Sequence, residues 1–420
     1  MPLIKRNILA RTAWLLGAVV TVAFLPACVA TAPQIERPAA ISNDALLEQG
    51  IQFAVEDLLA QALKTPGFQI QPKSALDQLL KTGNNKPVEK SLVVIDNTLE
   101  GVAGQQTEGT RLVDRRMLQL LRDRLDSHEV AAVNAENVKS ANYLVTGTLT
   151  QAEVRNSNSG FKINVSLTDL RSGFVIAQAV ARVRSNGVDE TPTRFFRESP
   201  AVSKDRATDG QIKTAQTRAG AEADGLYLSR LPVAALISDG DKQYENGRCD
   251  EALKYYEAAV SRPAGQQLHV LNGIYLCQMQ LERMDAAEAA FGRIVALGLA
   301  TNNLSVKFLF RPGSVEFIGD SKVNAPYAMW LRQIARETAA AKVCMLVVGH
   351  TSKTGTEQVN NRLSLQRGAT IQRRLDLMAP EISGRIQPVG MGFKENLIGT
   401  GTDDLRDALD RRVEFKVRPC

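Results

Sequence analysis

The sequence has few of the residues that build metal centres, and few aromatic side chains. Its three histidines are His128, His269 and His350, and none lies in a close cluster with cysteine and carboxylate residues, so a zinc site is not expected. Aromatic residues make up only 5% of the chain. The net charge of +6 over 420 residues is compatible with contact to an anionic surface but falls short of a nucleic-acid-binding footprint.

The remaining composition is that of a globular protein. Apolar residues make up 44% and charged residues 23% of the chain, which excludes a wholly disordered or collagen-like protein. The length predicts two or three domains.

The N-terminus has the features of a secretory signal. Three basic residues precede an uncharged apolar run over residues 13–25, which is short for a permanent membrane span. The run ends in Leu25-Pro26-Ala27-Cys28 and resembles a bacterial lipobox, although Pro26 is uncommon at its position. The resemblance implies a signal peptide over 1–27, a diacylglycerol on Cys28 and, because Val29 follows, an outer-membrane address. Ordinary signal cleavage, with Cys28 incidental, is the alternative.

Residues 28–42 are rich in proline and alanine and are expected to tether an α+β domain at 43–185. Apolar residues recur every three to four positions from 43 to about 63 and over 110–125, which predicts two helices. Strands are predicted at 91–97 and near 129–133. Three alternating runs follow at 141–154, 161–170 and 174–183, separated by turn residues, and they predict an antiparallel meander.

The order of these segments resembles the periplasmic lipoprotein domain of LpoB, FlgO and CsgG. The likeness is carried by the strand at 92–97 that ends in Asp-Asn, the run Tyr-Leu-Val-Thr-Gly-Thr-Leu at 143–149, and the hairpin at 167–174. It contains no catalytic motif. The resemblance implies a surface that binds protein partners.

Residues 186–231 lack sustained periodicity and are expected to be a linker. Residues 232–301 are expected to be helical and contain an internal repeat. Gly247, Ala252, Tyr256 and Ala259 recur approximately as Glu282, Ala287, Phe291 and Ile294, an offset of 35. This period resembles the tetratricopeptide repeat, in which small residues let paired helices approach and an aromatic residue fills the groove. Two units are too few to stand alone, so the region is expected to lean on a neighbour.

Four cysteines remain for an oxidising periplasm: Cys249, Cys277, Cys344 and Cys420. They allow three pairings. Placement in the domains favours Cys249–Cys277 and Cys344–Cys420. Separate core thiols remain the alternative at each pair.

Residues 302–420 alternate strand and helix, which predicts an α/β sandwich. Expected strands lie at 306–310, 342–350, 385–392 and 411–417, and expected helices at 325–340 and 358–377. This segment resembles the OmpA-like peptidoglycan-binding domain. The residues that carry the resemblance are Phe310, Gly313-Ser314, Gly349-His350-Thr351, Gly355, Asn360, Leu363-Ser364, Arg367, Gly390, Gly392 and Arg411-Arg412-Val413-Glu414-Phe415.

The resemblance implies a site for the diaminopimelate of an uncrosslinked stem peptide, made by Thr351, Ser352, Asn360, Leu363 and Arg367. Arg367 corresponds to the arginine that grips the ligand carboxylate, a task suited to a planar guanidinium. One residue departs from the pattern, because Ser352 stands where the family usually has an aspartate opposite the ligand ammonium. This change allows weaker binding, a different ligand or a retained fold without binding; we expect retained but weakened binding.

No G-x-S-x-G, H-E-x-x-H or supported S-x-x-K motif is present, so no enzyme activity, cofactor or metal is expected. The sequence predicts a non-enzymatic lipoprotein on the periplasmic side of the outer membrane. It would bind peptidoglycan and recruit an envelope protein such as a peptidoglycan synthase or a secretion or appendage complex. The alternatives are a structural subunit of such a complex with degenerate wall binding, and a cell-wall enzyme.

Overall fold

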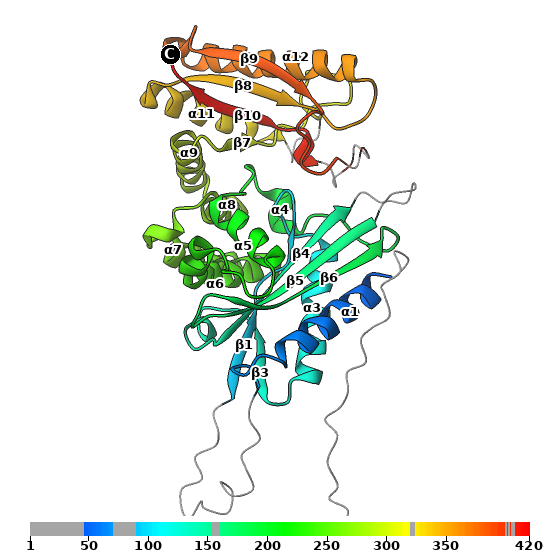
Figure 1. Ribbon diagram of the computed structural model, residues 1–420. Coiled ribbons are helices and arrows are strands. Elements are labelled where there is room, and N and C mark those ends of the chain that lie inside the picture. Colours follow the sequence, from blue (N-terminus) through cyan, green and yellow to red (C-terminus); the bar gives the residue numbers. More distant parts are fainter. Residues whose placement is uncertain are drawn as a thin grey trace, which may run out of the picture. The chain divides into compact units, whose positions relative to one another are not determined.

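The computed structural model describes residues 46–69, 90–152, 160–319, 324–399, 401, 404 and 408–420. All of them belong to one compact unit, a mixed α/β structure with two mixed sheets (Figure 1). The predicted signal peptide, Cys28 and the tether lie outside the described residues.

The first sheet has the strand order β3-β1-β4-β5-β6, with β2 paired to β4. Strand β1 runs parallel to β3 and β4, whereas β4, β5 and β6 are successively antiparallel. The predicted meander is therefore confirmed. The strands are β1 (Ser91–Ile95), β2 (Leu99–Glu100), β3 (His128–Ala132), β4 (Tyr143–Ala152), β5 (Gly160–Asp169) and β6 (Val175–Arg184).

Helices cover both faces of this sheet (Figure 1). Helices α1 (Leu47–Ala62) and α3 (Glu108–Arg124) pack on one face with Val93 and Ile95 of β1. On the other face, Leu92 and Val94 pack against α6 (Gly225–Glu245). Burial on both faces explains why β1 is a continuous apolar run rather than an alternating one.

The predicted linker at 186–231 is wrong in the described structure. It contains α4 (Arg194–Glu198), α5 (Arg206–Gln216) and the start of α6. Phe195 and Phe196 of α4 are buried in the core. The N–H of Val202 also donates to the carbonyl of Ser305, 2.9 Å away. A five-residue helix is too short to show a helical period in the sequence, so this helix was not predicted.

Residues 225–300 form two helix pairs, and the second helices of the pairs begin at the predicted offset of 35 residues, at Cys249 and Met284. The pairs are α6 with α7 (Cys249–Val260), and α8 (Leu268–Gln280) with α9 (Met284–Ala300). The ring of Tyr256 lies against Gly240 and Gly273, where an added Cβ would fall 2.6 Å and 2.4 Å from ring atoms. Tyr256 therefore fills the groove as expected. Membership of the tetratricopeptide family stays a prediction.

The second sheet has the strand order β7-β10-β8-β9, with β8 and β9 parallel and the other pairs antiparallel. Its strands are β7 (Leu304–Val306), β8 (Cys344–His350), β9 (Ile386–Gly392) and β10 (Val413–Arg418), and its helices are α11 (Tyr327–Ala341) and α12 (Glu357–Met378). The first strand was expected at 306–310 but lies at 304–306. Past Val306 the chain turns inward, and Phe308 packs its ring against Tyr327 and Trp330.

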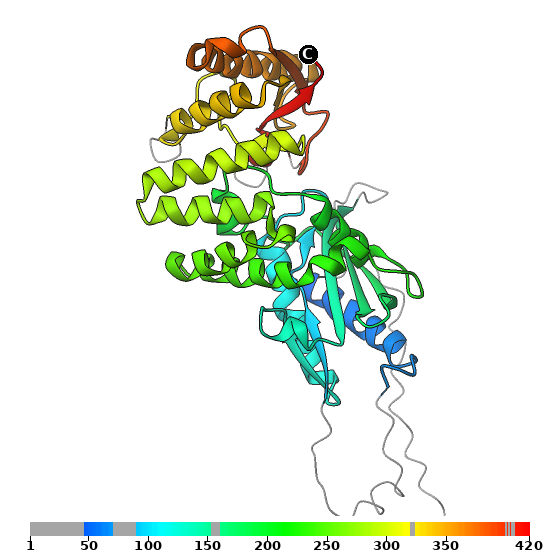
Figure 2. The same ribbon diagram turned by 90° about the vertical axis from the view of Figure 1, so that its left-hand side faces the viewer.

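The helices of residues 225–378 lie side by side in one stack (Figure 2), because α11 packs against both α9 and α12. Aromatic side chains of α9 and α11 pack together in this stack: Trp330 stacks on Phe291 with ring centroids 5.4 Å apart. Both helix pairs and the second sheet share one hydrophobic core. The repeats therefore pack against a neighbouring part of the chain, as predicted. Within the described part of the chain, no helix is both long and apolar enough to cross a membrane.

One of the two expected disulfides is present. Cys344 and Cys420 are bonded, because β8 and β10 are antiparallel and Arg418 pairs with Cys344, which brings the chain end beside the start of β8. The Cys249–Cys277 bridge is wrong, since both are buried free thiols. The predicted helix ends do meet, and the two thiols are hydrogen-bonding neighbours; Cys249 Sγ also donates to Gln280 Oε1 at 3.0 Å.

Candidate functional site

Two glycines let α12 approach the second sheet closely. A Cβ on Gly349 would lie 2.2 Å from the carbonyl oxygen of Ser364, and one on Gly390 would lie 2.5 Å from the nitrogen of Leu365. Helix and strands therefore meet backbone to backbone, which only glycine permits at these positions. This contact places the predicted site residues of α12 beside the loop that follows β8.

The loop at 351–356 is held by Asn360. Its Nδ2 donates to the carbonyl oxygens of Thr354 and Thr356, at 2.6 Å and 3.1 Å. Thr354 in turn shares a hydroxyl hydrogen bond of 3.1 Å with Ser352. Asn360 therefore braces the loop.

Thr351 anchors the start of this loop. Its N–H donates to the carbonyl of Gly392, 2.9 Å away. Its hydroxyl oxygen is buried and, among the described residues, has no hydrogen-bond partner. A buried polar atom of this kind needs a water or a ligand atom to satisfy it.

Arg367 is buried, with 3% of its surface exposed. Its Nε donates to the carbonyl of Ser314 at 3.1 Å and its Nη2 to the carbonyl of Arg311 at 3.2 Å. The guanidinium carbon lies 4.9 Å from the ring centroid of Phe310, within reach of a cation–π interaction. The guanidinium is therefore held in a fixed orientation and fastens the loop that follows β7.

The structure thus joins Thr351, Ser352 and Asn360 around one loop, and Arg367 lies about two turns further along α12. Leu363 is half-buried on the same helix. The carboxylate of Glu357, five residues after Ser352, pairs with Lys394 at 3.2 Å, and both side chains are exposed.

A buried ionic network lies beside this site. His350 Nε2 is 3.5 Å from Glu414 Oε1, and Arg412 and Lys416 pair with the same carboxylate. Burial alone would raise the pKa of Glu414, but the neighbouring imidazole of His350 and the charge of Arg412 lower it well below its ordinary value.

This network also contains the donors for a possible metal site. Ligand atoms of His350, Glu395 and Glu414 lie within 4.8 Å of one another. Lys416 pairs with Glu395 as well as with Glu414. Because lysine and arginine already neutralise both carboxylates, we interpret the cluster as an ionic brace of the sheet.

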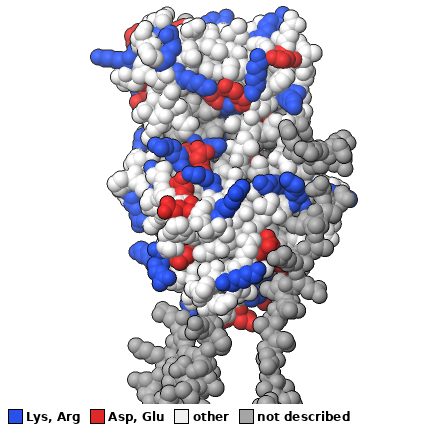
Figure 3. All heavy atoms as spheres, viewed as in Figure 1, with Lys and Arg blue, Asp and Glu red and all other residues white. Residues whose placement is uncertain are grey.

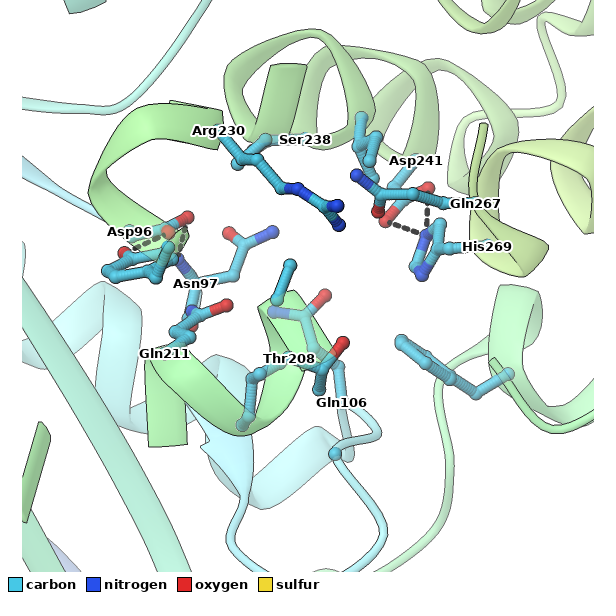
Figure 4. A pocket seen from close by; sticks show the side chains of 17 residues that line it. Asp96, Asn97, Gln106, Thr208, Gln211, Arg230, Ser238, Asp241, Gln267 and His269 are labelled. Atoms are coloured by element: carbon cyan, nitrogen blue, oxygen red, sulfur yellow. Dashed lines mark hydrogen bonds and ion pairs between the residues drawn. The ribbon is translucent and has the colours of Figure 1, made fainter. Parts of the chain in front are cut away.

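A small polar cavity of about 80 Å³ lies where the first sheet meets α5, α6 and α8 (Figure 4). Tyr227 donates to Asp96 at 2.5 Å. Asp241 accepts from Tyr256 at 2.7 Å and lies 2.9 Å from His269 Nε2. Both carboxylates are thus already satisfied, which fits a polar junction between sheet and helices.

Sequence reasoning missed this cavity, and also a larger one of about 520 Å³ between α4, α8 and α11. Both are assembled from segments far apart in the chain. No local motif marks them in the sequence; the buried Asp96, at the end of a parallel strand, was the one available signal.

Comparison with known proteins finds no matching family model and no matching curated protein. Among solved structures, a peptidoglycan-associated lipoprotein from Burkholderia pseudomallei is 23% identical over 27% of this chain and 89% of its own, with a TM-score of 0.23. An outer-membrane protein from Borrelia burgdorferi B31 is 25% identical over 28% of this chain and 88% of its own, with a TM-score of 0.19. A putative MotB-like protein from Desulfovibrio vulgaris is 19% identical over 33% of this chain and 94% of its own, with a TM-score of 0.23.

Proposed function

We propose that this protein is a non-enzymatic lipoprotein of the outer membrane that ties the membrane to peptidoglycan. Cys28 would carry the lipid, and the C-terminal sandwich would bind the wall. The observation that carries the proposal is the buried guanidinium of Arg367, which the carbonyls of Arg311 and Ser314 hold in place on the helix that also carries Asn360.

The ligand chemistry fits this arrangement. The free end of diaminopimelate presents an ammonium and a carboxylate side by side. A carboxylate pairs most strongly with a planar guanidinium whose orientation is already set, because less rotamer entropy is lost on binding. The carbonyls of Arg311 and Ser314 and the ring of Phe310 supply that orientation.

Ser352 would make the binding weak. A serine hydroxyl accepts a hydrogen bond from the ligand ammonium but contributes no charge, and charge-assisted hydrogen bonds are about twice as strong as neutral ones. The buried Thr351 hydroxyl offers a second acceptor at the same loop.

The middle of the chain would recruit an envelope protein, such as a peptidoglycan synthase or a secretion or appendage complex. Lys and Arg side chains are interspersed with Asp and Glu over the face in Figure 3 rather than gathered in one patch. This face therefore lacks the single positive patch that a polyanion would need.

Co-sedimentation with purified peptidoglycan sacculi tests the proposal. The chain expressed from Val29 onwards should sediment with sacculi at low salt and release no muropeptides on prolonged incubation. A chain that stays in the supernatant contradicts wall binding and favours a purely structural subunit. Released muropeptides would show a cell-wall enzyme. Metabolic labelling with palmitate, compared between the full chain and Cys28→Ala, tests the lipid.

A further inference from the structure

The larger cavity, of about 520 Å³, has mostly apolar walls. Phe196 of α4, Tyr275, Leu276 and Met279 of α8, and Tyr327 and Trp330 of α11 line it. We call it the Lys307 pocket, after the one lysine among its lining residues. Its volume lies within the range of sites that bind small molecules.

The amine of Lys307 is buried and incompletely bonded. Lys307 has 8% of its surface exposed, and Nζ donates to the carbonyls of Phe196 and Arg197 at 2.8 Å and 3.1 Å. An ammonium carries three donors. In the described part of the chain, Nζ has no third acceptor and forms no ion pair.

The neighbouring charges do not neutralise this amine. Glu198 also lines the pocket, but its carboxylate already accepts from the hydroxyl of Tyr244 and pairs with Arg194 at 3.1 Å. Arg197 adds a second cation to the lining and lies 3.9 Å from the same Glu198 carboxylate, so the lining holds two cations and one anion. The pocket therefore combines apolar walls with an excess of positive charge, which is complementary to an apolar anion.

We propose that the Lys307 pocket binds a linear alkyl carboxylate of the medium-chain fatty-acid class. The carboxylate accepts from Lys307 Nζ, and the alkyl chain packs against Leu276, Tyr327 and Trp330. A charge-assisted hydrogen bond to the carboxylate completes the bonding of the buried ammonium.

Main-chain N–H groups around the pocket are already hydrogen-bonded within the protein, which favours this ligand over a peptide terminus. The N–H of Leu309 donates to Tyr327 Oη at 3.0 Å, and the N–H of Lys307 donates to the carbonyl of Pro200 at 2.9 Å. The N–H of Ser199 is bonded to Phe195 within α4. A ligand with one polar end suits such a wall, whereas a peptide would bury unpaired amide groups.

Trp330 provides the readout. The sequence has two tryptophans, and the chain expressed from Val29 keeps only Trp330. Titration of decanoate at pH 6.5 is expected to change the Trp330 fluorescence in a saturable way. Burial lowers the pKa of Lys307 to about 7, so this pH favours the ammonium.

Matched ligands test the role of charge without altering the protein. Decan-1-ol and decyltrimethylammonium keep the alkyl chain and should bind at least about tenfold more weakly than decanoate. Equal affinity for the alcohol or the cation overturns the proposal. So does binding of acetyl-Leu-Phe, a peptide carboxylate, in the absence of decanoate binding.

A variant then tests the residue. Lys307→Met keeps an unbranched apolar stem one atom shorter but removes the charge, and should weaken decanoate binding about tenfold while leaving decan-1-ol binding unchanged. Unchanged decanoate affinity overturns the assignment. If the variant does not fold, the comparison of matched ligands on the wild-type chain still decides.

Discussion

Trp330 Nε1 donates a hydrogen bond to the hydroxyl of Tyr275 across 2.9 Å, and this bond joins α11 of the C-terminal sandwich to α8 of the helix pairs. Both residues are buried. The sandwich and the helix pairs therefore share specific polar contacts as well as apolar surface. Segments predicted as separate domains are coupled in the folded protein.

Tyr275→Phe should lower the free energy of unfolding by about 1–3 kcal/mol, because it leaves the buried indole N–H without an acceptor. Urea unfolding followed by circular dichroism measures this change. Tyr255→Phe, at a half-buried tyrosine one helix earlier, is the control and should cost less than about 0.5 kcal/mol. Equal effects of the two substitutions would show that the bond contributes nothing.

Alkylation tests the cysteine assignment. In the chain expressed from Val29, iodoacetamide under denaturing, non-reducing conditions should modify Cys249 and Cys277 alone. Mass spectrometry then shows two adducts, and four after reduction. Four adducts without reduction would exclude the Cys344–Cys420 bridge, and none would show that Cys249 and Cys277 are bonded.

The regular elements were predictable because their signals are local. The period-two runs of β4 to β6 and the apolar spacing of three to four residues in α3 appear directly in the sequence. So does the offset of 35 residues that relates the starts of α7 and α9, at Cys249 and Met284. The placement of Arg367 on α12 also follows from local spacing. These features depend on residues that are near one another in the chain.

Other features depend on contacts that no local pattern reports. Phe195 is buried by contacts with Tyr244 of α6 and His269 of α8, which are distant in the sequence, so no local pattern distinguished α4 from a linker. The helix ends bring Cys249 and Cys277 together, yet both remain free thiols. The bonding of Arg367 to carbonyls of its own chain was equally invisible.

Stability should fall as pH rises from about 4.5 to 7. Burial raises the pKa of Asp114 and of Glu100, each to about 7, whereas carboxyl groups of unfolded chains titrate near 4. The native state therefore binds more protons in this window, and each group lowers the free energy of unfolding by at most about 1.4 kcal/mol per pH unit.

Asp114→Asn should flatten this pH dependence, because the amide does not titrate. It should leave the fold intact, because the amide oxygen still accepts from the N–H of Thr98, which lies 2.8 Å from Asp114 Oδ1. Urea unfolding at half-unit steps from pH 4.5 to 8 measures the slope. Asp123→Asn, at an exposed position of the same helix, is the matched control. A slope identical in Asp114→Asn and wild type would contradict the assignment.

Ser352→Asp should strengthen binding to sacculi about five- to tenfold, because it adds a charge opposite the ligand ammonium. Ser352→Asn introduces a side chain of the same size as aspartate but without its charge, and should not gain affinity for sacculi. Binding isotherms with sacculi at low salt compare the three proteins. Equal gains for Asp and Asn would show that charge at position 352 is irrelevant.

The most direct test of the central claim is the sacculus affinity of Arg367 variants in the chain expressed from Val29. Arg373→Ala removes an exposed arginine of the same helix, whose Nη2 contacts Thr370 at 3.3 Å, and so controls for charge. Trp330 fluorescence verifies that each variant is folded, and Arg367→Lys keeps the charge without the planar fork. We predict that Arg367→Ala and Arg367→Lys lose at least about tenfold in affinity while Arg373→Ala binds like wild type; a folded Arg367→Ala that sediments as well as wild type would contradict the account.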